Sequence, residues 1–275
     1  MAGRPKTIYG RRVTNRWWPV DEGTVVNTTT PRARHLLVAA TVLAFLIAFG
    51  LPVVIAVWTL TGATRGLSWA TPEFQIGFNL VAVLVAVGLF FLFRQLGAPL
   101  TVVTAGKRGL RTAAFLAGIW LLSQLLAAPI SLLIDALVTS PGGGGHDSTS
   151  AMGVLNGISW ALAAGFGEEI IVNAGVVRSL ELINAPTWAI YLVAIVARLS
   201  FHVYYGWATL EKVLWAGLTV WGYRRARMLW PLVAIHTVHD ISVAVPSPPL
   251  SVGLTVVKTA LILFVVVSVL RRPSP

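Results

Sequence analysis

The chain has 275 residues, of which 56% are hydrophobic and only 11% are charged, and its mean hydropathy is +0.78. A soluble domain carries about 25% charged residues, because its surface must be hydrated. The composition therefore excludes a soluble globular protein and predicts an all-α, polytopic bundle of transmembrane helices. Cysteine is absent, which excludes disulfides, thiolate metal sites and a cysteine nucleophile.

The formal net charge of +11 does not indicate a nucleic-acid partner. The basic residues lie in the N-terminal segment and in short loops between apolar runs, where the positive-inside rule places them in membrane proteins. Residues 1–35 are expected to form a flexible basic cytoplasmic tail. The first apolar run is too long for the core of a cleavable signal peptide.

Apolar runs of about 20 residues are long enough to cross the ~30 Å hydrocarbon core of a bilayer. The sequence predicts about eight, namely Leu36–Leu60, Ile76–Leu96, Thr112–Val138, Met152–Leu182, Thr187–Tyr205, Leu210–Tyr223, Leu229–Val245 and Leu250–Leu270. The first three form an N-terminal part, 36–140, and the last five form a C-terminal part, 151–272. The glycine-rich segment 141–145 separates the two parts.

Basic residues alternate between the ends of these runs. One set of ends carries the N-terminal arginines, Arg94, Lys107, Arg178, Arg224 and Arg271, whereas the opposite loops hold only Arg65 and Lys212. With eight spans, the positive-inside rule places both termini in the cytoplasm. We expect a multi-pass protein of the cell (plasma) membrane, with the lipid bilayer as a partner.

Ionisable groups inside the predicted spans are few, and each costs roughly 2.5–3.5 kcal/mol at mid-span. They gather in three spans: Glu168 and Glu169, with the polar Asn173, in the fourth, Arg198 and His202 in the fifth, and His236, His239 and Asp240 in the seventh. Residues four apart share a helix face, so one of each such pair can orient the other. The spacing predicts that the three spans bring these side chains together in one site.

Single polar residues often only join membrane helices through hydrogen bonds, and His239 and Lys258 of the eighth span fit that reading. Two adjacent glutamates with two histidines and an aspartate on three helices indicate a functional site instead. Carboxylate and histidine can activate and hold a water for hydrolysis. Buried Glu and His are equally natural in a proton- or cation-coupled carrier.

Three short motifs carry a resemblance to a known family. They are Glu168-Glu169-Ile-Ile-Val-Asn173-Ala-Gly, Arg198-Leu-Ser-Phe-His202-Val-Tyr-Tyr-Gly206 and His236-Thr-Val-His-Asp240. In order, separation and membrane setting they resemble the CPBP family of intramembrane endopeptidases, the CAAX proteases and bacteriocin-processing enzymes also called the Abi family. The resemblance covers residues 160–241 and implies a membrane-associated protein or peptide substrate.

The resemblance also implies roles for the catalytic candidates. Glu168 would activate the hydrolytic water, His202 would hold that water from the facing helix, and Glu169 would support the helix. His236 and Asp240 would stabilise the oxyanion or, in the older metalloprotease view of the family, bind a metal together with Glu168 and His202. We expect a reaction without a cofactor, and zinc stays open as the alternative.

Two positions depart from the family pattern. The family usually has an arginine where this chain has Asn173, and often a phenylalanine where it has Arg198. A buried ionised Glu169 needs a cation or several donors. We therefore predict that Arg198 reaches Glu169 from the next helix and that Asn173 adds a hydrogen bond. Two other functions stay open, a catalytically silent membrane scaffold of the same fold and a proton-coupled carrier.

Overall fold

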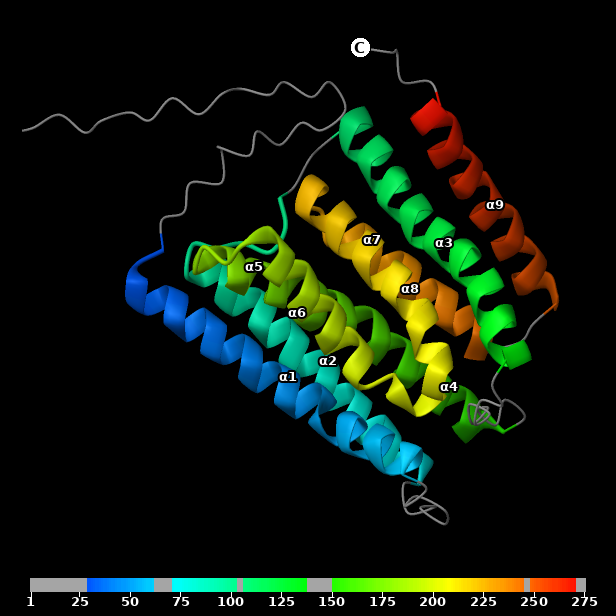
Figure 1. Cartoon of the computed structure of the whole chain (residues 1–275), viewed down its shortest axis with the longest axis horizontal. Coiled ribbons are helices and arrows are strands. Elements are labelled where there is room, and N and C mark those ends of the chain that lie inside the picture. The colour runs from blue at the N-terminus through cyan, green and yellow to red at the C-terminus, as the bar shows by residue number, and fades with distance from the viewer. Residues whose placement is uncertain (1–28, 62–70, 103–105, 138–149, 245–247, 271–275) are drawn as a thin grey trace, which may run out of the picture.

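The computed structural model describes residues 29–61, 71–102, 106–137, 150–244 and 248–270, and within these residues every regular element is a helix (Figure 1). The elements are α1 (Pro31–Leu60), α2 (Pro72–Gln95), α3 (Gly106–Leu137), α4 (Ala151–Ala163), the π-helical η1 (Ala164–Gly175), α5 (Val176–Leu182), α6 (Thr187–Ser200), the 3₁₀-helical η2 (Val203–Leu210), α7 (Glu211–Ala226), α8 (Trp230–Ala244) and α9 (Pro248–Leu270). The prediction of an all-helical protein is confirmed for this part of the chain.

Local sequence explains where the first two helices begin. Thr30 caps α1 by accepting a hydrogen bond from the Ala33 backbone N–H, and Thr71 caps α2 in the same way. A proline follows each cap, at a position where its missing N–H and fixed φ favour a helix start. Because α1 begins at Pro31, the predicted tail of 35 residues is too long by about one helical turn at its end. Residues 1–28 lie outside the described part.

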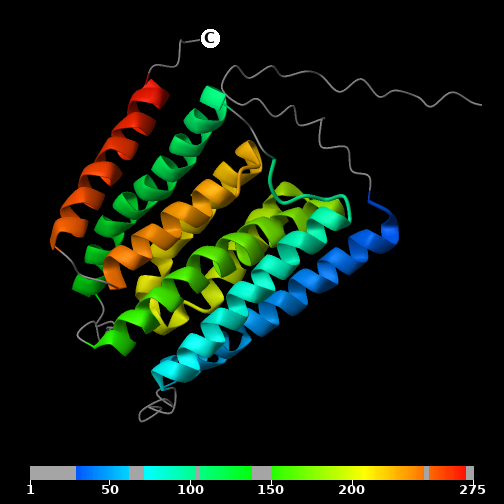
Figure 2. The same ribbon diagram turned by 180° about the vertical axis from the view of Figure 1, so that it is seen from behind.

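The helices run back and forth in a bundle (Figures 1 and 2). Four helices are long and apolar enough to cross a membrane: Pro31–Leu60, Pro72–Gln95, Gly109–Ile134 and the continuous run Ala151–Leu182. The last is 78% buried over its apolar window, against 22% for each of the first two. The run Ala151–Leu182, formed by α4, η1 and α5, is therefore the central helix. It is surrounded by α1, α2, α6, α7 and α8, whereas α3 and α9 lie further out.

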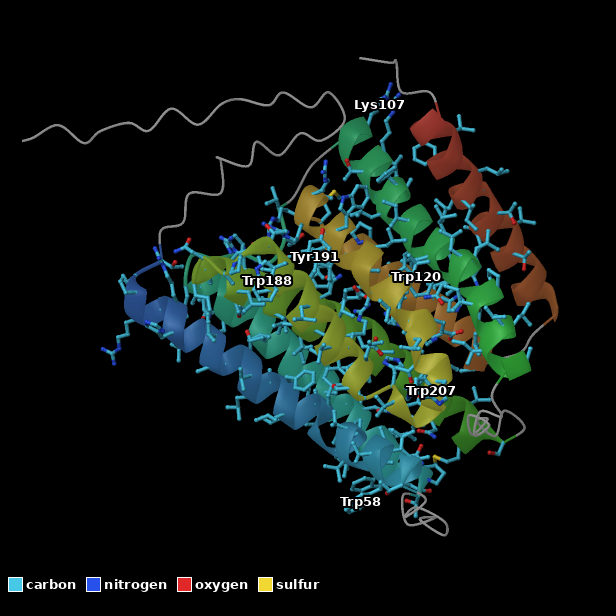
Figure 3. All side chains as sticks on the ribbon, viewed as in Figure 1. Trp58, Lys107, Trp120, Trp188, Tyr191 and Trp207 are labelled. Atoms are coloured by element: carbon cyan, nitrogen blue, oxygen red, sulfur yellow. The ribbon has the colours of Figure 1, made fainter. Side chains whose placement is uncertain are left out.

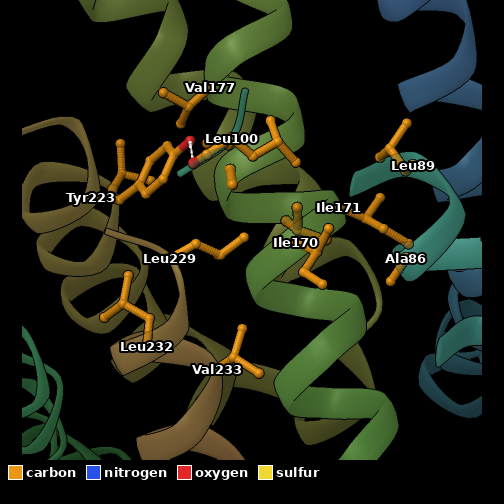
Figure 4. Packing of buried hydrophobic residues seen from close by; sticks show 14 of the residues in the cluster. Ala86, Leu89, Leu100, Ile170, Ile171, Val177, Tyr223, Leu229, Leu232 and Val233 are labelled. Carbon is orange, nitrogen blue, oxygen red and sulfur yellow. Dashed lines mark hydrogen bonds between the residues drawn. The ribbon is translucent and has the colours of Figure 1, made fainter. Parts of the chain in front are cut away.

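Large apolar side chains cover the outside of the bundle, as expected of a surface that faces lipid. Leu84, Leu132 and Val243 are each about 70% exposed. Inside the bundle, Ile170 of η1 lies near Leu229 and Val233 at the start of α8 (Figure 4). Tyr223 of α7 donates a hydrogen bond to the carbonyl of Leu100, which follows α2. The buried apolar cluster thus holds the central helix from several sides.

The fifth predicted span differs from the structure. We expected one run over Thr187–Tyr205, but α6 ends at Ser200 and the 3₁₀ helix η2 follows. Gly206 interrupts η2 with φ 64° and ψ −136°, a conformation that only glycine adopts readily. The chain therefore turns directly after the second motif, which holds His202 at the end of α6. The predicted break at 141–145 lies outside the described residues.

Candidate active site

The glutamate motif lies on η1, the π-helical middle of the central helix. A π-helix has wider turns than an α-helix and occurs frequently at functional sites. Close packing fixes its position: a Cβ on Gly165 would collide with Thr237 of α8, and one on Gly167 would lie 3.1 Å from the Phe49 ring of α1. Small residues at these points let α8 and α1 approach η1 closely.

Arg198 of α6 reaches across to the glutamate pair, as predicted. Its Nη2 donates to Oε1 of Glu169 at 3.0 Å and to the backbone carbonyl of Glu168 at 3.1 Å. Its Nε lies 3.8 Å from Oε2 of Glu168, and its guanidinium carbon lies 4.3 Å from the centroid of the Trp215 ring. Arg198 is 2% exposed, so this cation is removed from water and depends on these partners.

Glu169 is fully buried and is surrounded by donors from three helices. Besides Arg198, Nδ2 of Asn173 donates to its Oε2 at 2.9 Å, and Nδ1 of His236 lies 3.0 Å from its Oε1. The predicted hydrogen bond of Asn173 is therefore confirmed. One carboxylate accepts from η1, α6 and α8 at once, which joins the three motifs into a single hydrogen-bonded unit.

His236 is held between two carboxylates. Its Nδ1 faces Glu169, and its Nε2 lies 3.4 Å from Oδ2 of Asp240, one turn further along α8. We call Glu169, Asn173, Arg198, His236 and Asp240 the Glu169 network. The predicted pairing of His236 with Asp240 is confirmed, and both ring nitrogens of His236 are engaged within the network.

His202 and Glu168 face each other beside this network. Nδ1 of His202 lies 2.8 Å from the carbonyl oxygen of Arg198, and since a carbonyl only accepts, Nδ1 is the donor. In the neutral ring, Nε2 then carries the lone pair, and it lies 4.0 Å from Oε1 of Glu168. That gap is too wide for a direct hydrogen bond. The other oxygen of Glu168, Oε2, is buried without a hydrogen-bond partner.

A cavity of about 110 Å³ opens next to Glu168 and His202. At about 30 Å³ per molecule, it has room for several waters. Most of its walls are apolar or aromatic: Phe49 and Pro52 of α1, Phe78 of α2, Trp160 of α4 and Phe201. The residues of the Glu169 network do not line it. The predicted site residues therefore come together in space, but only Glu168 and His202 reach the cavity.

Two polar residues of the cavity wall were not recognised from the sequence. Tyr204 follows His202 by two residues and lines the cavity, with its ring 6.4 Å from the His202 ring. Asn79 of α2 also lines it and donates to Oγ of Ser159 at 3.0 Å. Tyr204 stood inside the second motif, and its spacing from His202 was the only available signal. Asn79 was a single polar residue in an apolar run, which carries no such signal.

The possible zinc ligands are not arranged around a common point. Among the described residues, no group of three or more His, Asp and Glu side chains is placed to hold a metal ion. Both ring nitrogens of His236 contact carboxylates of the Glu169 network, and the Arg198 guanidinium contacts both glutamates. The four residues Glu168, His202, His236 and Asp240 therefore do not fit a tetrahedral zinc site in this arrangement.

Two further ionisable residues of the predicted spans, His239 and Lys258, lie outside the site. His239 packs its ring against Trp120 of α3 at 4.9 Å. Lys258 of α9 donates to Oγ of Ser242 at 3.2 Å. Both contacts join α8 to its neighbours, in agreement with the structural role expected for these two residues.

Comparison with known families gives a match over the segment that contains the candidate site residues. The family model of type II CAAX prenyl endopeptidases, Rce1-like, matches residues 150–242. This segment belongs to the CPBP, or CAAX protease, family. The CAAX protease segment runs from the N-cap of α4 into the last turn of α8 and contains every candidate site residue. No curated protein and no solved structure matches the chain.

Proposed function

We propose that the protein is an intramembrane endopeptidase that hydrolyses peptide bonds of membrane-associated proteins or peptides, using a water activated by glutamate. The observation that carries the proposal is that Glu168 and His202 face each other at 4.0 Å and both line a cavity inside the bundle. Membership of the CAAX protease family supports the same reaction class. It also makes a lipid-anchored C-terminal segment the substrate class to test first.

In the first step, the nucleophilic water lies against Glu168 and His202. It donates one hydrogen to a Glu168 oxygen and the other to Nε2 of His202, both of which are acceptors. The water oxygen attacks the scissile carbonyl carbon while its proton passes to Glu168, and the carbonyl electrons move onto the oxygen. The backbone carbonyl of Arg198 keeps the His202 ring in the tautomer that this geometry needs.

In the second step, the tetrahedral intermediate collapses. The oxyanion reforms the C=O bond, the C–N bond breaks, and Glu168 gives its proton to the departing nitrogen. Glu168 thus acts first as a base and then as an acid, as a single carboxylate can in peptide hydrolysis. The products are a carboxylic acid and an amine, so atoms and protons balance without a co-reactant.

The oxyanion needs a hydrogen-bond donor that faces the cavity. Tyr204 lines the cavity beside His202, and a phenol O–H can donate without carrying a charge. We assign this role to Tyr204. The resemblance implied it for His236, but Nε2 of His236 faces Asp240, and it would have to leave Asp240 to reach an oxyanion.

The Glu169 network then has a positioning role. It fixes Arg198, whose backbone carbonyl orients His202 and whose side chain holds the carbonyl of Glu168. His236 and Asp240 complete the network from α8. In this proposal they act on the reaction through Glu168 and His202.

The proposed reaction uses no metal. Purified, active protein with stoichiometric zinc, whose activity is lost to a chelator and restored by zinc, would overturn this part of the proposal and return His236 and Asp240 to the role of ligands. The carboxylate mechanism requires instead that activity survives chelation in protein shown to be free of metal.

We further propose eight membrane spans with both termini in the cytoplasm of a plasma-membrane protein. The described helices alternate in direction, and their basic residues gather at one end of the bundle: Arg32, Arg34, Arg94, Lys107, Arg111, Arg178, Arg224, Arg225 and Arg227. Lys107 marks this end in Figure 3, and Trp58 and Trp207 mark the other. Both indoles are exposed, as is common at membrane–water interfaces.

The decisive experiment compares membrane-peptide fragments from cells that carry wild-type protein with those from cells that carry Glu168→Gln. Fragments that depend on the wild-type protein should disappear, since an amide cannot take the proton from water. Glu73→Gln is the matched control, because Glu73 is an exposed glutamate in the first turn of α2. Identical fragments from Glu168→Gln and wild type would favour the silent scaffold.

A further inference from the structure

A second group of charges lies at the end of the central helix, away from the site. Glu181 of α5 is thirteen residues beyond Glu168 and is contacted by three arginines from two parts of the chain. Nη2 of Arg227 lies 2.7 Å from its Oε1, Nε of Arg224 lies 3.3 Å from the same oxygen, and Nη1 of Arg178 lies 3.5 Å from Oε2. We call these four residues the Glu181 cluster.

The cluster has more cationic donors than acceptors. Three guanidinium groups share one carboxylate, which leaves two positive charges without a counter-charge inside the cluster. Arg178 is only 7% exposed, yet its Nε and Nη2 have no hydrogen-bond partner, and neither does the buried Nη1 of Arg227. Against these three donors, one acceptor of the cluster, Oε2 of Glu181, is also buried without a hydrogen bond. An unsatisfied buried donor costs about 1–3 kcal/mol, and more when the group is charged.

The chain holds these arginines in place. Arg227 ends α7 with φ 52°, in the left-handed region that a non-glycine residue rarely adopts. Its carbonyl accepts from the Val102 backbone N–H at 2.7 Å, and the neighbouring Tyr223 hydroxyl donates to the Leu100 carbonyl at 2.6 Å (Figure 4). The Arg224 guanidinium carbon lies 5.6 Å from the centroid of the Tyr191 ring. The excess of donors is therefore part of a constrained structure.

We propose that the Glu181 cluster is a phosphate-binding site that takes the headgroup phosphate of an anionic membrane lipid. Guanidinium forks match phosphate oxygens and form charge-assisted hydrogen bonds with them. The cluster lies at the basic end of the bundle, where basic pockets between transmembrane helices bind anionic headgroups. Arg224 and Arg227 keep side-chain exposures of 24% and 18%, so a headgroup can approach.

The test measures bound lipid on detergent-purified, full-length protein by native mass spectrometry, after exposure to phosphatidylglycerol or phosphatidylcholine. Wild type should retain phosphatidylglycerol in preference. Arg224→Gln with Arg227→Gln should lower that retention at least about tenfold, the equivalent of one charge-assisted hydrogen bond. Arg225→Gln is the control: it removes one positive charge at the same end of α7, but Arg225 is exposed and stacks on Trp221 instead.

A gain-of-binding variant guards against misfolding. Glu181→Gln removes the carboxylate that competes for the three arginines, so it should raise retention of phosphatidylglycerol. Loss of folding cannot produce that increase. A cluster that only joins helices would show the opposite, namely lower thermal stability with no additional lipid.

A second arm separates lipid phosphate from free phosphate. If inorganic phosphate, without added lipid, raises the melting temperature of wild type and Arg225→Gln but not of the double variant, the site takes free phosphate, and the lipid assignment is replaced. Retention of phosphatidylglycerol that millimolar phosphate does not displace supports the lipid. Equal retention by wild type and the double variant, with no effect of phosphate, overturns the site. None of these readouts depends on peptide cleavage.

Discussion

At the scale of single residues, the clearest feature of the site is the cation that neutralises the buried Glu169. Asn173 cannot neutralise Glu169, and Arg198 supplies the charge from a different helix while Asn173 keeps a hydrogen bond. The buried carboxylate thus has both a counter-charge and a neutral hydrogen-bond donor. Removal of one partner of a buried ion pair leaves the other charge uncompensated, at a cost of about 3–5 kcal/mol.

Arg198→Leu is therefore expected to abolish cleavage and to lower the melting temperature, because Glu169 loses its cation and the backbone carbonyl of Glu168 loses its donor. Arg198→Leu combined with Asn173→Arg should recover part of the stability and part of the activity. Cleavage and the melting temperature of both variants are measured on purified protein in detergent. Wild-type melting behaviour of Arg198→Leu alone would contradict the buried ion pair.

Tyr204→Phe tests the assigned oxyanion donor. Loss of one such donor in other enzymes lowers kcat by about 10²–10³, and we expect a loss of that order with little change in KM. Tyr191→Phe is the matched control, because Tyr191 of α6 does not line the cavity. Equal activity of Tyr204→Phe and wild type would return the oxyanion role to His236.

At the scale of elements, the glycines of η1 determine how closely α8 and α1 approach the glutamate motif. A Cβ atom on Gly165 would overlap with Thr237, whereas a Cβ atom on Gly88 of α2 would have no neighbouring atom within 4 Å. Replacement of glycine by alanine should therefore change the stability in opposite directions at these two positions.

Gly165→Ala is expected to destabilise the protein by roughly 1–3 kcal/mol, the usual cost of overpacking. It should also lower activity, since α8 carries His236. Gly88→Ala should be neutral or stabilising by up to about 1 kcal/mol, because alanine is the better helix former. Melting curves of the two variants check the difference, and equal shifts would argue against a close contact between η1 and α8.

At the scale of the whole molecule, charge asymmetry sets the proposed orientation. Basic residues gather at one end of the bundle. The opposite end carries Glu73 and the neighbouring pair Glu211 and Lys212. The Glu181 cluster lies at the basic end, which the proposed topology, based on the positive-inside rule, places on the cytoplasmic side.

The absence of cysteine makes this orientation easy to test. A single cysteine at Arg225 should react with a membrane-impermeant maleimide only after the cells are opened, whereas one at Glu73 should react in intact cells. Both residues are exposed in the structure. Labelling of Arg225→Cys in intact cells would reverse the proposed topology.

The sequence by itself determined the membrane class, the helical fold and the identity of most site residues, because charge in hydrocarbon is costly and its few occurrences are informative. It also predicted the Arg198–Glu169 contact, since a buried carboxylate needs a partner and few cations were in reach. Only the tertiary structure showed the π-helical η1, the division between the cavity residues and the Glu169 network, and the Glu181 cluster. These features depend on how helices distant in sequence pack against each other, and helical spacing within one segment does not contain that information.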